Sequence, residues 1–155
     1  MSERLQIRAD DLSGGEVQAL LAEHLADMYA TSPADSVHAL DLEALRAPDI
    51  TFYSAWDDGT LLGCGALRDL GDGHLEIKSM RAVREHRGRG TGAAMLLHLL
   101  AEAARRGAAR VSLETGVEDY FAPARRLYAR HGFVECPPFA DYVPDPHSVF
   151  MTRAV

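Results

Sequence analysis

Three glycines within five residues constrain the fold of this chain more than any other feature. The segment 87–92, Arg-Gly-Arg-Gly-Thr-Gly, follows a strand-like segment and leads into an apolar, helix-like segment. Because glycine has no side chain, backbone amides in such a loop can approach an anion at the positive end of the helix dipole. The sequence therefore predicts a strand–loop–helix unit whose loop binds a phosphate group.

Apolar periodicity predicts the elements that surround this loop. Helices are predicted where apolar residues recur every three or four positions, at 17–28, 41–46, 93–104 and 120–130. In the helix after the loop, Leu96, Leu97 and Leu100 are expected on one buried stripe. Strands are predicted at 5–8, 50–56, 60–67, 74–83, 109–114, 132–135 and 148–151. Since a helix connects 74–83 to 109–114, these two strands should be parallel.

Composition narrows the class of protein. The 155 residues, 47% of them apolar, predict a single domain spanning 1–155 with one core. The net charge of -7 argues against a nucleic-acid partner. Cys64 and Cys136 lie far apart, which indicates neither a disulfide framework nor a zinc site. The chain has no apolar run of about 18 residues and no signal-peptide core, so we expect a cytoplasmic protein without a membrane partner.

A second motif narrows the interpretation of the glycine loop. The helix predicted at 120–130 runs into 127–133, Leu-Tyr-Ala-Arg-His-Gly-Phe, about 40 residues after the loop. Together with Arg-x-x-Gly-x-Gly at 87–92, this order resembles the GCN5-related N-acetyltransferase (GNAT) family, and more closely a bacterial subgroup of small acetyltransferases. The resemblance implies an α/β fold with a mixed, mainly antiparallel sheet of six or seven strands. It also implies that this sheet is splayed between two parallel central strands and carries helices on both faces.

The resemblance also implies where acetyl-CoA would bind. The loop would hold the pyrophosphate, through Arg87, Gly88, Arg89, Gly90, Thr91 and Gly92. The preceding strand would pair its backbone with the pantetheine arm, through Met80, Arg81, Ala82 and Val83. An amide near Met80 would polarise the thioester carbonyl, and Tyr128 would protonate the departing thiolate. No metal is expected.

Four further residues are candidates for the acceptor side, which we expect to receive a small-molecule primary amine. Glu76 lies four residues before Met80 and is therefore expected on the same sheet face, where it could take the amine proton directly or through water. Lys78 shares that alternation and would hold Glu76 ionised or contact an acidic acceptor. Glu114 ends the neighbouring strand, and His38 lies on a loop that would cover the acceptor site.

The sequence leaves several alternatives open. Tyr128 could be a core tyrosine, and Glu76 with Lys78 an ordinary surface ion pair. His38 and Glu114 could have no role in the site. The proline-rich segment 137–146 could line the acceptor pocket or form a homodimer surface. A polyamine acceptor would favour the carboxylates, whereas an amino acid would favour Lys78. A catalytically inactive acyl-CoA-binding sensor would keep the loop and lose turnover.

Overall fold

Seven strands form one mixed sheet in the computed structural model, which describes residues 5–38 and 40–155. Their order is β1-β2-β3-β4-β5-β7-β6, and β4 and β5 are parallel neighbours while all other pairs are antiparallel. The strands are β1 (Leu5–Ala9), β2 (Ile50–Asp57), β3 (Thr60–Asp69), β4 (His74–Ala82), β5 (Arg110–Gly116), β6 (Val134–Glu135) and β7 (Ser148–Ala154). The expected mixed, mainly antiparallel sheet with a parallel central pair is confirmed.

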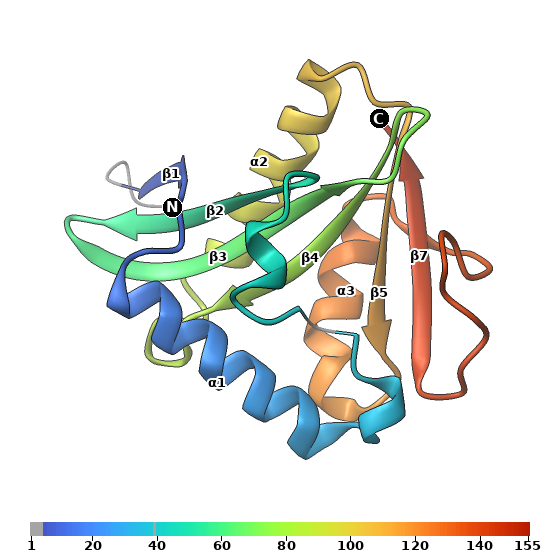
Figure 1. Ribbon diagram of the computed structural model, residues 1–155, viewed down its shortest axis with the longest axis horizontal. Coiled ribbons are helices and arrows are strands. Elements are labelled where there is room, and N and C mark those ends of the chain that lie inside the picture. Colours follow the sequence, from blue (N-terminus) through green and yellow to red (C-terminus); the bar gives the residue numbers. More distant parts are fainter. Residues whose placement is uncertain (1–4, 39) are drawn as a thin grey trace.

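Helices cover both faces of this sheet (Figure 1). On one face lies α1 (Gly15–Thr31), whose Val17, Leu20 and Leu21 are buried against apolar residues of β2 and β3. On the other face lie α2 (Thr91–Arg105) and α3 (Ala122–Arg130), which share a larger core with β4 and β5. None of the described helices combines the length and apolar character needed to cross a bilayer.

The two parallel strands separate halfway along their length. Their last paired residues are Ile77 and Leu113, although β4 continues to Ala82 and β5 to Gly116. Beyond that pair, the peptide groups on the β5-facing edge of β4 have no strand partner. The predicted splay therefore begins after Ile77 and leaves an open backbone edge immediately before the glycine loop.

A β-bulge in β4 changes the direction of the side chains that follow it. Ser79 has a left-handed backbone with φ 53°, and the pairing with β3 passes from Lys78 opposite Ala66 to Arg81 opposite Cys64. One extra residue in a strand moves every later side chain to the other face. Met80 consequently packs against the α2–α3 core, whereas Lys78 and Arg81 both lie on the α1 face.

Three local expectations need correction. The segment 41–46 forms only a 3-10 turn at Ala44–Arg46, because Pro48 leaves too little chain for a stable helix. The helix predicted at 120–130 begins as a separate 3-10 turn, Asp119–Phe121, so α3 is shorter. Leu97 is 54% exposed, because the buried stripe of α2 runs through Leu96 and Leu100 and a neighbouring residue lies about 100° away around the helix.

Candidate active site

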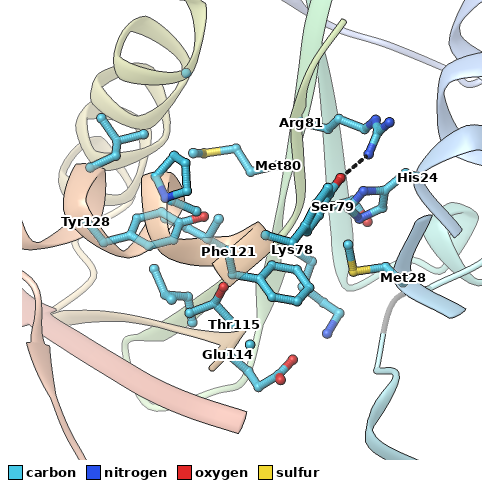
Figure 2. A pocket seen from close by; sticks show the side chains of 18 of the residues that line it. His24, Met28, Lys78, Ser79, Met80, Arg81, Glu114, Thr115, Phe121 and Tyr128 are labelled. Atoms are coloured by element: carbon cyan, nitrogen blue, oxygen red, sulfur yellow. Dashed lines mark hydrogen bonds between the residues drawn. The ribbon is translucent and has the colours of Figure 1, made fainter. Parts of the chain in front are cut away.

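A single cavity of about 450 Å³ occupies the splay between β4 and β5. Its donor half is lined by the glycine loop, the start of α2 and the apolar face of α3, including Arg87, Gly88, Thr91, Gly92, Leu127 and Tyr128. Its acceptor half is lined by α1, the loop that follows it and the α1-facing residues of β4 and β5, including His24, Met28, His38, Glu76, Lys78 and Glu114. The structure thus brings residues from both ends of the chain to one opening in the sheet (Figure 2).

The glycine loop has the backbone geometry of an anion site. Gly88 has φ 84° and Gly90 has φ 80°, a left-handed conformation that side chains disfavour. A Cβ atom at either position would meet no other atom, so close approach from outside is open. The first amide of α2 that donates within the helix is that of Ala94, to the Gly90 carbonyl at 3.0 Å. The amides before it are therefore available to an external acceptor, as at helix N-termini generally.

The two arginines of the loop differ in direction. Arg87 is exposed at the cavity, which it lines together with Gly88. Arg89 instead donates to Asp57 Oδ2 at 3.0 Å and contacts His86 Nδ1 at 3.1 Å. Arg87 is thus the loop arginine whose charge faces the cavity, while Arg89 ties the loop to the end of β2.

Tyr128 lies in the donor half of the cavity and is buried in α3 (Figure 2). Its ring packs edge-on against Phe133, with ring centroids 5.7 Å apart. Burial, with a smaller effect from Glu114, raises the pKa of the Tyr128 hydroxyl far above its ordinary value. The hydroxyl therefore stays protonated at neutral pH and carries a proton that it could donate, although burial also makes it a weaker acid than a free tyrosine.

Glu76 and Met80 do not share a sheet face, contrary to the expectation from their spacing. Glu76 and Lys78 precede the bulge at Ser79 and lie on the α1 face, while Met80 follows it and lies on the α2–α3 face. Both still line the cavity, because the cavity passes through the splay. The bulge therefore puts these two predicted residues on opposite sides of the sheet at one opening.

Glu76 and Lys78 form a buried cluster with a tyrosine from the proline-rich segment. Lys78 Nζ donates to Glu76 Oε2 at 3.2 Å and to the Tyr142 hydroxyl at 2.9 Å, and that hydroxyl donates to Glu76 Oε2 at 2.5 Å. Glu76 is 1% exposed and Lys78 is 9% exposed, so this is not a surface ion pair. The Tyr142 ring also packs against His38, with centroids 5.0 Å apart. Tyr142 thus contacts three residues of the acceptor half, although no residue of 137–146 itself lines the cavity.

The remaining predicted acceptor residues also reach the cavity. Glu114 and His38 both line it, from β5 and from the loop after α1. Burial raises the pKa of Glu114 to about 7, an effect that the side chain of Ser148 and the positive charge of Lys78 partly offset. Sequence reasoning missed two histidines of the same wall, His24 and His147. Their signal was weak, since each is an isolated histidine without a motif around it.

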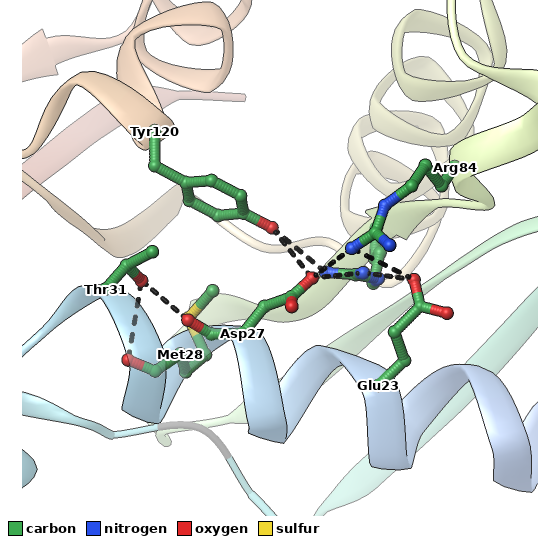
Figure 3. A network of polar contacts seen from close by, with 7 residues as sticks. Glu23, Asp27, Met28, Thr31, Arg84 and Tyr120 are labelled. Atoms are coloured by element: carbon green, nitrogen blue, oxygen red, sulfur yellow. Dashed lines mark hydrogen bonds and ion pairs between the residues drawn. The ribbon is translucent and has the colours of Figure 1, made fainter.

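A polar network joins α1 to the strand edge at the cavity (Figure 3). The side chain of Arg81 is 3% exposed, and its Nη2 atom lies 2.5 Å from Glu23 Oε1 and 2.6 Å from Asp27 Oδ2. Its Nη1 atom donates to the Tyr120 hydroxyl at 3.1 Å. Arg81 was predicted as a backbone contact for the donor, and its side chain has the separate role of holding α1 against β4. Within the described residues, no three His, Cys, Asp or Glu side chains gather as a metal site.

Comparison with known proteins agrees with this geometry. The chain is 52% identical over 149 residues to the Uncharacterized N-acetyltransferase YsnE of Bacillus subtilis, which covers 96% of this chain and 99% of that protein. A Klebsiella pneumoniae structure named as an acyl-CoA N-acyltransferase has a TM-score of 0.78 and 29% identity, covering 97% of each chain. The fold is also shared with a GNAT acetyltransferase of Elizabethkingia anophelis that has acetyl-CoA bound, with a TM-score of 0.70 and 15% identity, covering 99% of this chain and 100% of the other.

A family model agrees with these likenesses. The model described as Acetyltransferase (GNAT) family matches residues 17–133, which include the glycine loop, both splayed strands and α3. The relatives covered along their whole length are bacterial. The chain is therefore an acyltransferase. It belongs to the GNAT family of acetyltransferases, among its small bacterial members.

Proposed function

We propose that this protein transfers the acetyl group of acetyl-CoA to a primary amine of a small molecule. The observation that carries the proposal is the continuity of one cavity, which runs from the free amides of the glycine loop through the splay to a set of charged side chains. A donor with a phosphate at one end and a thioester at the other matches the first part. An amine that must lose a proton before it attacks matches the second.

On the donor side, the loop from Arg87 to Gly92 would hold the pyrophosphate. The fit rests on the left-handed Gly88 and Gly90 and on the unpaired amides at the start of α2. The β5-facing edge of β4 after Ile77 would pair with the pantetheine arm, in the manner of an added strand. Of the residues predicted for this contact, Met80, Arg81 and Ala82 lie in this part of β4, whereas the Val83 amide donates to the Leu62 carbonyl of β3 at 2.8 Å.

The chemistry would be a direct attack. The neutral amine adds to the thioester carbonyl, and the amide of Met80 donates to the oxygen that becomes negative in the tetrahedral intermediate. The carbon–sulfur bond then breaks, and Tyr128 donates its proton to the departing thiolate. The proton lost by the amine passes to a carboxylate of the acceptor half, Glu76 or Glu114, directly or through water. No step uses a metal ion.

The first experiment measures turnover. The protein is incubated with acetyl-CoA and a panel of primary amines, and free thiol is followed with a chromogenic disulfide. We expect amine-dependent thiol release together with acetylated amine detected by mass spectrometry. Acetyl-CoA binding without turnover for every amine would instead identify an inactive acyl-CoA-binding module.

A second experiment tests the donor site. We expect Gly90→Leu to abolish acetyl-CoA binding in isothermal titration calorimetry, because a side chain there would stand between the ligand and the amides. Gly59→Leu is the matched control, since Gly59 has φ 82° and open space around its Cβ but lies in the β2–β3 turn. Equal affinities in the two variants would contradict the assignment of the loop.

A further inference from the structure

Among the described residues, Glu114 is the charged side chain of the acceptor half that forms no ion pair. We infer that the acceptor is a cationic amine without a carboxylate group, and that Glu114 binds its ammonium. This inference rests on the proposed function and narrows its acceptor class. It follows from how the positive charges of the acceptor half are already paired.

The two cationic side chains on the α1 face near the splay are both neutralised. Arg81 is held between Glu23 and Asp27, which gives it two carboxylates for one charge. Lys78 is held by Glu76 and by the Tyr142 hydroxyl, and the pair is almost fully buried. Releasing Lys78 to bind a substrate carboxylate would leave buried Glu76 without its cation, which is strongly unfavourable. Lys78 therefore serves the internal cluster and not an acidic acceptor.

Glu114 is in a different position, because it makes no ion pair with any described residue. Glu76 and Ser112 are cross-strand partners on the α1 face, so Lys78 and Glu114 are the next residues on that face of the two strands. They would be neighbours if the ladder continued, but the strands have already separated. Figure 2 shows both side chains directed toward the same part of the cavity. Glu114 thus presents a carboxylate at the mouth of the splay.

A substrate carboxylate would meet a negative environment here. It would face Glu114 and Glu76, with Asp145 behind Ser36, which donates to Asp145 Oδ2 at 2.7 Å. Two of the three histidines in this half, His24 and His147, offer little compensation. Burial, helped by the charge of Arg81, lowers the pKa of His24 to about 4, so this ring is neutral at pH 7. His147 is engaged with Glu118 Oε2 at 3.1 Å.

An ammonium group meets the opposite conditions. It supplies the counter-charge that Glu114 lacks, in a cavity with a lower dielectric than bulk water, where such a pair is stronger than at an exposed surface. Burial raises the pKa of Glu114, and a bound ammonium would counter this effect because it favours the ionised carboxylate. This part of the cavity therefore favours the binding of a positively charged group and disfavours that of a negatively charged group.

The test compares acceptors that differ only in a carboxylate. Tyramine is compared with tyrosine, histamine with histidine and cadaverine with lysine, using thiol release to measure kcat/KM. We expect the amine of each pair to exceed the amino acid at least tenfold. Equal or higher values for the amino acids would overturn the inference while leaving the proposed function intact. If no compound is acetylated, calorimetric binding of the same pairs to the protein–CoA complex decides the inference independently of turnover.

Two variants locate the effect. Glu114→Gln should lower kcat/KM at least tenfold more for the amines than for the amino acids, so that the ratio within each pair shrinks. Glu135→Gln removes the same charge from the exposed strand β6, outside the cavity, and should preserve the ratio. A ratio that Glu114→Gln leaves unchanged would show that the preference has another source.

Discussion

Replacing Glu114 with glutamine should make the free protein more stable at neutral pH while it weakens acceptor use. Burial raises the pKa of this carboxyl from its usual 4.5 to about 7 in the folded state. Between these two values the folded chain binds more protons than the unfolded chain, so the free energy of unfolding falls as pH rises. The difference between these two pKa values lowers the free energy of unfolding by about 3 kcal/mol above pH 7. Water in the cavity screens the charge, so we expect about 1–3 kcal/mol.

Glutamine has nearly the same shape and no charge, so the variant should escape this cost. For a chain of this length the gain corresponds to a rise in Tm of about 2–12 °C at pH 8. The difference should shrink as pH falls and be only about 0.4 kcal/mol at pH 4.5, where Glu114 is protonated in the folded state and half protonated in the unfolded state. Differential scanning calorimetry from pH 4.5 to 8 measures it, with Glu135→Gln as the control. A variant no more stable than the parent at pH 8 would refute the argument that Glu114 is buried without an ion-pair partner.

Three further perturbations test other parts of the structure. Tyr128→Phe keeps the ring packing but removes the proton donor, so kcat should fall by about 10²–10³-fold with little change in acetyl-CoA affinity; unchanged kcat would contradict the acid role. Lys78→Met should destabilise the fold by about 3–5 kcal/mol in urea titrations, because buried Glu76 loses its cation, and Glu76→Gln in the same chain should recover at least half. Leu96→Ala should cost about 2–5 kcal/mol, whereas Leu97→Ala should cost about 0.5 kcal/mol or less, and similar losses would contradict the stripe seen in α2.

The order of elements and the donor loop could be predicted because their signals are local. Glycines at a strand–helix junction and apolar residues at regular spacing identify β4, the loop and α2 within about 30 consecutive residues. The motif ending at Phe133 is local in the same sense. Such patterns reflect backbone geometry and one buried face, which a short segment determines mostly by itself.

The arrangement of the acceptor half could not be predicted, because it depends on contacts between residues far apart in the sequence. Tyr142 joins Glu76 across 66 residues, and Arg81 joins Glu23 across 58. The sequence around Ser79 does not predict the bulge, because no local sequence pattern indicates a serine with positive φ. Counting by two along β4 therefore gave the wrong relation between Glu76 and Met80. The residues were predicted, but their arrangement required the fold.

The helix α1 is attached to the sheet in two different ways along its length. Its first half is anchored by Val17, Leu20 and Leu21, whereas its second half has no fully buried residue and is fastened by Glu23 and Asp27. The wall formed by His24 and Met28 belongs to the second half. Salt weakens ion pairs that are exposed to solvent, whereas it leaves apolar packing unchanged or strengthens it. Raised ionic strength should therefore affect the second half of α1, which carries this wall, more than the first half.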